Sequence, residues 1–216
     1  MIRTAPEGRW FILGAWLVAL ALIVVAARSG SVGWTAGAAV CTVLSVWVVA
    51  FFRDPERAWA RGDRLVVAPA DGKVVSLVEV DEPAFFQGRA QRVSIFMNVF
   101  DCHVNRYPAD GTVAYRHYNP GAFGHAAAEK SSLSNEQSSV GLMTARGKVL
   151  VRQIAGLIAR RIVTDHGVGA VVHQGDRLGM IRFGSRVDLF LPLGTRVLVH
   201  VGDTTRVGVT VVAEWN

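Results

Sequence analysis

Cysteine is scarce in this sequence, which contains only Cys41 and Cys102. The two residues form no C-x-x-C pair. Cys41 falls within a long apolar run, whereas Cys102 lies in the more polar part of the chain. A thiol inside a membrane segment is not placed to pair with one outside it. The cysteine usage therefore indicates no disulfide and fits a reducing, cytosolic setting for the polar part.

Runs of basic residues are also missing. The net charge is +6 at pH 7, but the arginines are scattered and no aromatic side chains are interleaved with them. This distribution argues against nucleic acid as a partner. A basic chain of this kind suits an anionic membrane surface or an acidic ligand.

Several catalytic signatures are absent. There is no G-x-S-x-G motif and no glycine-rich loop with phosphate-binding spacing, and the six histidines include no H-x-H or H-E-x-x-H grouping. These absences exclude the serine hydrolase elbow, the common zinc sites and a P-loop. We therefore expect no metal site.

What the sequence does have is two long uncharged apolar runs near its start. They extend from Trp10 to Ala27 and from Val32 to Phe52, separated by a polar break that contains Arg28. Each is close to the roughly 20 residues that a helix needs to cross a bilayer. The runs predict a membrane helical hairpin over residues 1–52. The alternatives are a hairpin that lies in one leaflet and a pair of helices in a hydrophobic core.

Basic residues flank both ends of this hairpin. Arg3 and Arg9 precede it, and Arg53, Arg57 and Arg61 follow it. The positive-inside rule then places both flanks in the cytoplasm, although Arg28 in the turn opposes this orientation. We expect a cell-membrane protein whose C-terminal domain faces the cytoplasm.

Residues 53–216 have the pattern of a β-rich domain. Short apolar segments alternate with Gly, Pro, Asn and Asp turns, which is typical of a β-sandwich or a barrel-sandwich-like fold. The predicted strands are Leu65–Ala68, Lys73–Val80, Arg92–Phe100, Thr112–Tyr118, Val168–Val172, Leu178–Phe183, Val187–Leu191, Arg196–Val201 and Val207–Ala213.

Two segments of this domain have a different pattern. Gly147 to Val163 predicts a strand through Val151 and then a short helix, Ala155 to Arg161. Lys130 to Ser139 predicts a loop or a loop with a short helical turn. The expected fold class is thus β-rich α+β, with one or two short helices in the domain of residues 53–216.

Three places in the β domain concentrate reactive side chains where strands end. Asp71 lies in a tight turn between two strands, His103 lies in a polar string after a strand, and Gly184-Ser185 interrupts Met180–Pro192, which otherwise reads as one strand. Glycine inside a strand marks a bulge or a close approach to the backbone. A carboxylate, an imidazole and a hydroxyl are together the groups that activate a serine.

Seven blocks of the sequence contain these reactive residues and their surroundings. In chain order they are Phe52–Pro55, Ala68–Gly72, Phe96–Val99, His103–Arg106, Pro120-Gly121, Arg152–Ile162 and Gly179–Asp188. In this order they resemble the short bacterial and archaeal type of phosphatidylserine decarboxylase proenzyme. The resemblance covers residues 52 to about 192, and the preceding hairpin also fits.

The resemblance implies a lyase that is made as a zymogen and generates its own pyruvoyl cofactor. Ser185 would attack the carbonyl of Gly184, and elimination would leave a pyruvoyl group at residue 185. The products would be a β chain of residues 1–184 and an α chain of residues 185–216 that remain associated. Asp71 and His103 would orient and deprotonate Ser185, and the glycine would leave its carbonyl open to attack.

The resemblance also implies the reaction: phosphatidylserine from the membrane forms a Schiff base with the pyruvoyl group, loses CO2 and leaves as phosphatidylethanolamine. One departure stands out, because longer members of the family have a second histidine where this chain has Arg106. His103 would then serve both maturation and turnover, with His166 and His125 as reserves. Arg53, Arg57, Arg182 and Arg186 are candidates to attract the anionic lipid.

Two other functions remain open. Asp71–Val75 and Gly175–Gly179 resemble the strand-turn pattern of lipoyl- and biotinyl-type modules, so a membrane-anchored binding or adaptor module without catalysis is one alternative. A decarboxylase of a related serine lipid, such as archaetidylserine, is another. Homo-oligomers are compatible with either.

Overall fold

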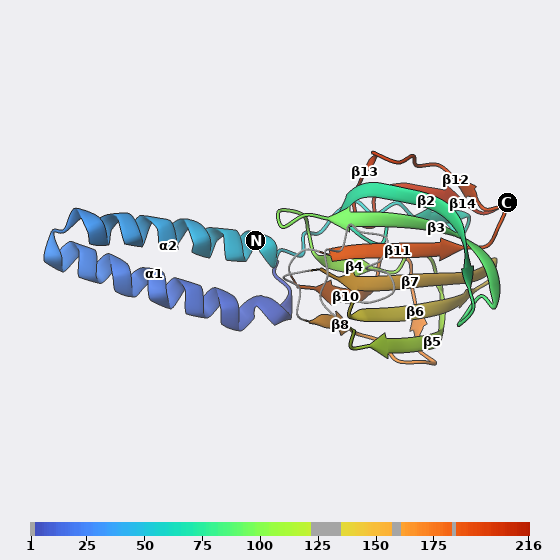
Figure 1. Ribbon diagram of the computed structural model, residues 1–216, viewed down its shortest axis with the longest axis horizontal. Coiled ribbons are helices and arrows are strands. Elements are labelled where there is room, and N and C mark those ends of the chain that lie inside the picture. The colour runs from blue at the N-terminus through green and yellow to red at the C-terminus, as the bar shows by residue number, and fades with distance from the viewer. Residues whose placement is uncertain (1–2, 122–134, 157–160, 183–184) are drawn as a thin grey trace. The chain divides into compact units, whose positions relative to one another are not determined.

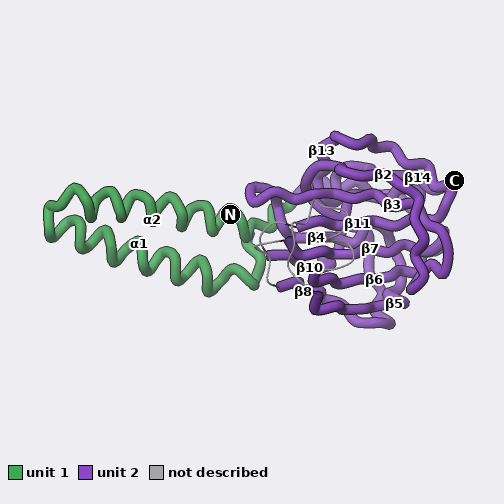
Figure 2. Tube along the Cα trace, in the orientation of Figure 1, with its two compact units in different colours: residues 1–56 green, residues 57–216 purple. Residues whose placement is uncertain are grey.

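The computed structural model describes residues 3–121, 135–156, 161–182 and 185–216. The chain divides into two compact units, Met1–Glu56 and Arg57–Asn216 (Figure 2). The first unit is helical and the second is built from strands (Figure 1). The proposed division of the chain at residue 184 therefore falls within the second unit.

The first unit is a hairpin of two apolar helices. A short 3₁₀ turn η1 (Pro6–Gly8) leads into α1 (Arg9–Ser29), and α2 (Val32–Phe51) follows. Gly30 ends α1 with a φ of +63°, a left-handed conformation that glycine adopts without a Cβ penalty. Both helices are long and apolar enough to cross a membrane, by length and composition.

Large apolar side chains of these helices are exposed rather than packed. Trp10 is 80% exposed, Leu17 57% and Val43 69%. Helices of a hydrophobic core would bury such residues, so this exposure argues against the core alternative. The predicted hairpin of two apolar helices is confirmed.

The second unit contains an eight-stranded antiparallel sheet that curls into a half-barrel (Figure 1). Its strand order is β13-β2-β3-β11-β7-β6-β5-β9, and two three-stranded sheets, β1-β14-β12 and β4-β10-β8, complete the unit. The strands are β1 (Leu65–Val67), β2 (Gly72–Glu82), β3 (Gly88–Met97), β4 (Val104–Arg106), β5 (Gly111–Asn119), β6 (Gln137–Thr144), β7 (Gly147–Ala155), β8 (Ile162–Thr164), β9 (Val171–Val172), β10 (Arg177–Ile181), β11 (Ser185–Leu191), β12 (Arg196–Val197), β13 (Thr204–Thr205) and β14 (Val211–Glu214). The β-rich fold class is confirmed.

Strand β11 lies in the middle of the large sheet, between β3 and β7. Its alternate residues Val187, Leu189 and Leu191 belong to the main hydrophobic core. Because side chains alternate across a strand, Ser185 points to the same inner face. The first residue of β11 is therefore directed into the interior of the half-barrel.

The predicted strands Leu178–Phe183 and Val187–Leu191 correspond to β10 and β11, but the two do not form one interrupted strand of the same sheet. β10 pairs with β4 and β8, whereas β11 pairs with β3 and β7. The chain thus passes from one sheet to another between Ile181 and Ser185. Gly184 and the predicted bulge lie outside the described residues.

Two local predictions also need correction. β7 continues to Ala155, so the strand is longer than expected and the predicted helix does not begin there. Residues 157–160 lie outside the described part of the chain. β6 begins at Gln137, within the stretch predicted as a loop. In both cases pairing between β6 and β7 stabilises extended backbone that the local pattern did not favour.

Candidate active site

Ser185 begins β11 at one end of the large sheet. It lies opposite Met97, the last residue of β3, and Ala155, the last residue of β7. The serine is fully buried, and its hydroxyl donates to the thioether Sδ of Met97 at 3.4 Å. A thioether is a weak acceptor, so the hydroxyl is held loosely for a buried polar group.

His103 lies just before β4, and its backbone carbonyl accepts a hydrogen bond from the N–H of Ile181 at 3.4 Å. The pairing of β4 with β10 thereby fixes His103 beside Ile181, which precedes Ser185 by four residues. The ring is fully buried, and Nδ1 lies 3.0 Å from the backbone carbonyl of Asp101. Because a carbonyl only accepts, Nδ1 carries the proton and Nε2 keeps the lone pair that a base requires.

Asp71 precedes β2 at the same end of the sheet. The neighbouring Gly72 has a φ of +146°, and a Cβ there would lie 2.2 Å from the carbonyl oxygen of Phe96 on β3. Only glycine allows this approach. The Asp71-Gly72 turn therefore packs against Phe96 at the end of β3. The next residue of β3 is Met97, which contacts Ser185.

The carboxylate of Asp71 binds Arg57 rather than His103. The Arg57 guanidinium makes a two-pronged contact with Oδ1 at 2.5 Å and Oδ2 at 2.7 Å, and the N–H of Val207 donates to Oδ1 at 2.7 Å. Ser185, His103 and Asp71 thus share one end of the strands, but Asp71 and Ser185 each contact other partners. The sequence suggested Arg57 only as a lipid-attracting residue.

The Arg57–Asp71 pair yields a stability prediction. Both side chains are largely buried, so Arg57→Ala leaves a carboxylate without its countercharge and should lower the free energy of unfolding by about 3 kcal/mol. The matched control is Arg89→Ala, because the Arg89–Glu79 pair is exposed and its loss should cost at most about 1 kcal/mol. Denaturant unfolding of the full chain in detergent measures both. Equal losses in the two variants would contradict the prediction.

Arg106 occupies the position of the second histidine in longer relatives, but its side chain points elsewhere. Its guanidinium stacks on the Trp59 ring at 4.5 Å and donates to the carbonyl of Gly175 at 2.9 Å. The preceding residue, Asn105, points to the opposite side and contacts Met97 Sδ at 3.7 Å. Arg106 is therefore a packing residue in this chain.

Sequence reasoning missed a series of buried, hydrogen-bonded polar side chains that reaches Met97, the residue in contact with Ser185. Gln153 and Asn105 are both fully buried, and Gln153 Nε2 donates to Asn105 Oδ1 at 2.8 Å. A signal for Gln153 was present, since it takes an inward position in the alternating series Val149, Val151, Gln153 of β7. A polar residue at such a position needs a buried partner.

The other candidates have described contacts with residues other than Ser185 or lie outside the described part of the chain. His166 contacts the hydroxyl of Tyr107 through Nδ1 at 3.3 Å, and burial raises the pKa of Tyr107 to about 12. His125 lies outside the described residues. Arg186 forms a buried ion pair with Asp188 at 2.9 Å on the sheet face opposite Ser185, so it is not exposed to a lipid. No cluster of three potential metal ligands occurs in the described ranges.

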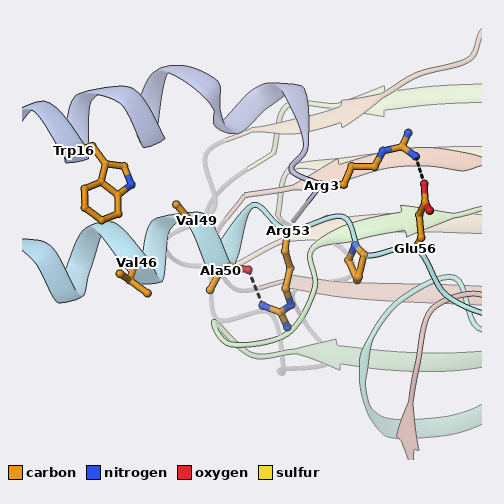
Figure 3. Close-up of a pocket in the computed structure, with 8 residues that line it drawn as sticks. Arg3, Trp16, Val46, Val49, Ala50, Arg53 and Glu56 are labelled. Carbon is orange, nitrogen blue, oxygen red and sulfur yellow. Dashed lines mark hydrogen bonds and ion pairs between the residues drawn. The ribbon is translucent and has the colours of Figure 1, made fainter. Parts of the chain in front are cut away.

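A cavity of about 920 Å³ is lined by residues of the helical unit (Figure 3). Its apolar wall includes Trp16 of α1 and Val46 of α2, and its polar rim includes Arg3, Arg53 and Glu56. Arg3 pairs with Glu56 at 3.3 Å, while Arg53 donates to the carbonyl of Ala50 at 2.7 Å. In a bilayer this apolar groove would be open to lipid chains, and none of Ser185, His103 or Asp71 lines it.

The fold and the site together define a small β-rich enzyme that carries an apolar helical hairpin. The phosphatidylserine decarboxylase family matches residues 44–213. Phosphatidylserine decarboxylase proenzymes of Symbiobacterium thermophilum, Geotalea daltonii and Rickettsia africae are 49%, 41% and 44% identical to this chain. These alignments cover 96%, 97% and 97% of the chain and 94%, 95% and 89% of the relatives.

The chain therefore belongs to the phosphatidylserine decarboxylase family, and it is a decarboxylase. The resemblance predicted from residues 52 to about 192 is confirmed, and the matched region extends past it at both ends.

Proposed function

We propose that this chain decarboxylates phosphatidylserine to phosphatidylethanolamine after cutting its own backbone between Gly184 and Ser185. The observation that carries the proposal is the position of Ser185. Ser185 is the first residue of a central strand, its side chain points into the interior, and among the described residues its hydroxyl donates to a thioether. The word proenzyme in the names of the relatives supports a maturation step.

Maturation is proposed to be an acyl shift followed by elimination. Ser185 Oγ loses its proton and bonds to the carbonyl carbon of Gly184, and the Gly184–Ser185 C–N bond breaks as the nitrogen takes up a proton. A base then removes the Cα proton of residue 185 as the Gly184 carboxylate leaves by β-elimination, which gives dehydroalanine. Water hydrolyses the dehydroalanine to a ketone and ammonia. Gly184 becomes the C-terminus of the β chain, and residue 185 becomes the start of the α chain.

His103 is proposed as the base that takes the Ser185 proton. Its Nε2 carries the lone pair, because the Asp101 carbonyl accepts from Nδ1. Catalytic hydrogen bonds are often long before the reacting geometry forms, so the lack of a direct Ser185–His103 contact is compatible with this role. Asp71, fixed by Arg57 and Val207, is proposed to stabilise the positive charge that this transfer creates.

The surroundings of Ser185 fit a pyruvoyl group at that position. Ser185 is fully buried, its hydroxyl contacts the neutral thioether of Met97, and the amide N–H of Asn105 contacts the same sulfur atom. A ketone there would supply an electrophile for the serine amine and a sink for the electrons released as CO2 leaves. His103 is proposed to return a proton to the carbon from which CO2 departs.

The cleaved chains are proposed to stay together, with the α chain on the membrane-anchored β chain. β11 is paired along its length with β3 and β7, and cutting before Ser185 leaves these hydrogen bonds in place. The two apolar helices are proposed to anchor the protein in the cell membrane, where its substrate lies. The arginines at both ends of the hairpin favour a cytoplasmic β unit.

A reconstitution experiment tests the reaction. The full chain, placed in phosphatidylcholine vesicles that contain phosphatidylserine, is expected to release CO2 and form phosphatidylethanolamine, measured by mass spectrometry of the lipids. Vesicles with phosphatidylglycerol in place of phosphatidylserine provide the control, because that anionic lipid lacks the amine and the carboxylate. A processed chain that leaves phosphatidylserine unchanged would refute the proposed substrate, whereas an intact and inactive chain would favour a binding module.

A further inference from the structure

Two buried donors converge on the sulfur atom of Met97. The Ser185 hydroxyl lies 3.4 Å from Sδ, and the amide nitrogen Nδ2 of Asn105 lies 3.7 Å from the same atom. All three side chains are fully buried. The Asn105 amide and the hydroxyl of the serine that is proposed to attack therefore share one buried contact atom.

A chain of hydrogen bonds behind Asn105 sets the direction of its amide. Thr164 donates from Oγ1 to Gln153 Oε1 at 3.1 Å, and Gln153 donates from Nε2 to Asn105 Oδ1 at 2.8 Å. Thr164 in turn lies 2.8 Å from the hydroxyl of Ser138. Since Oδ1 is engaged by Gln153, the N–H end of the Asn105 amide is directed at the sulfur of Met97, which Ser185 also contacts.

The Asn105 amide N–H is thus directed at a weak hydrogen-bond acceptor, the thioether of Met97. A thioether accepts hydrogen bonds poorly, and a buried donor without a good acceptor costs about 1–3 kcal/mol. A buried donor that lacks a good acceptor stabilises a nearby oxygen strongly when that oxygen acquires negative charge. Such an oxygen forms when Ser185 Oγ adds to the neighbouring carbonyl carbon.

We propose that Asn105, aimed by Gln153, donates the hydrogen bond that stabilises this negative oxygen during self-cleavage. The inference rests on the proposed self-cleavage at residues 184 and 185. The Oγ–C bond forms, the C–N bond breaks, and the Oγ proton ends on the released nitrogen, while Asn105 keeps its own protons. Asn105 thereby acts in maturation from a position next to Arg106, whose own side chain lies on Trp59.

The test follows precursor cleavage over time in cell-free synthesis with vesicles of phosphatidylcholine and phosphatidylglycerol. Asn105→Ala removes the donor, and Asn105→Asp keeps the shape but replaces the amide N–H with an acceptor. The matched control is Gln174→Ala, since Gln174 is another buried amide with three hydrogen bonds, to Gly62, Leu65 and Pro108. Each variant is also made together with Ser185→Ala, so that unfolding is measured on an uncut chain.

Both Asn105 variants are expected to cleave about 100-fold more slowly than the wild type, while Gln174→Ala stays within about twofold. A folded Asn105 variant that cleaves at the wild-type rate would overturn the inference, and so would equal slowing by Gln174→Ala. If Asn105→Ala does not fold, the rate of Asn105→Asp decides. A wild-type chain that never cleaves would refute the proposed self-cleavage itself, whereas unaffected variants beside a cleaving wild type refute only the role of Asn105.

Discussion

Ser185→Ala is expected to give an intact 216-residue chain with no decarboxylase activity. The substitution removes Oγ, the atom proposed to attack the backbone, and with it the source of the ketone at residue 185. No other group can supply both functions, so the expected loss is complete in cleavage and in turnover. Gel electrophoresis after synthesis measures cleavage, and release of CO2 from phosphatidylserine vesicles measures turnover.

The matched control for this variant is Ser94→Ala. Ser94 is also a fully buried strand serine, and it lies in β3 opposite Asp188, a strand residue three positions after Ser185. Ser94→Ala should cleave and turn over like the wild type. Cleavage that persists in Ser185→Ala would place the nucleophile elsewhere and would contradict the proposed origin of the cofactor.

His103→Ala should have the second largest effect, slowing self-cleavage by about 10² to 10⁴-fold because a positioned general base is lost. The ring is fully buried and its tautomer is fixed by Asp101, so the substitution removes an oriented Nε2 rather than a freely moving group. Cleavage kinetics in cell-free synthesis measure the effect. The processed fraction, once purified, should also turn over phosphatidylserine more slowly if His103 acts in both steps.

His166→Ala is the control for the loss of an imidazole. His166 is half-buried and contacts Tyr107, and the described contacts of Ser185 do not include it. Its removal should leave the cleavage rate within about threefold of the wild type, which is the scale of an indirect effect compared with a lost base. Wild-type cleavage by His103→Ala, or a stronger effect of His166→Ala, would exclude His103 as the base.

Local sequence patterns predicted much of the fold. Two uncharged runs of helix length predicted α1 and α2, and the alternation of Val187, Leu189 and Leu191 predicted the inner face of β11. The placement of β10 and β11 in different sheets was not predicted. Sheet membership depends on partners far along the chain, such as Val104 for β10 and Met97 for β11, and no local pattern encodes that choice.

The site was predictable in its reactive groups but not in its contacts. The sequence singled out Asp71, His103 and Ser185 because they are polar residues at the ends of predicted strands. The ion pair of Arg57 with Asp71 was not foreseen, because Arg57 follows the apolar hairpin and its charge was equally consistent with a lipid surface. Asn105 was hidden for a different reason: only the pairing of β4 with β10 determines that it faces inward while Arg106 faces Trp59.

The most direct measurement is the intact mass of the C-terminal fragment of the purified protein. Self-cleavage with conversion of Ser185 predicts a fragment of residues 185–216 that lacks a free amine and is about 17 Da, one ammonia, lighter than the same peptide beginning with serine. A fragment with an unmodified N-terminal serine would show cleavage without cofactor formation. An active protein whose chain remains a single uncut polypeptide would contradict the mechanism altogether.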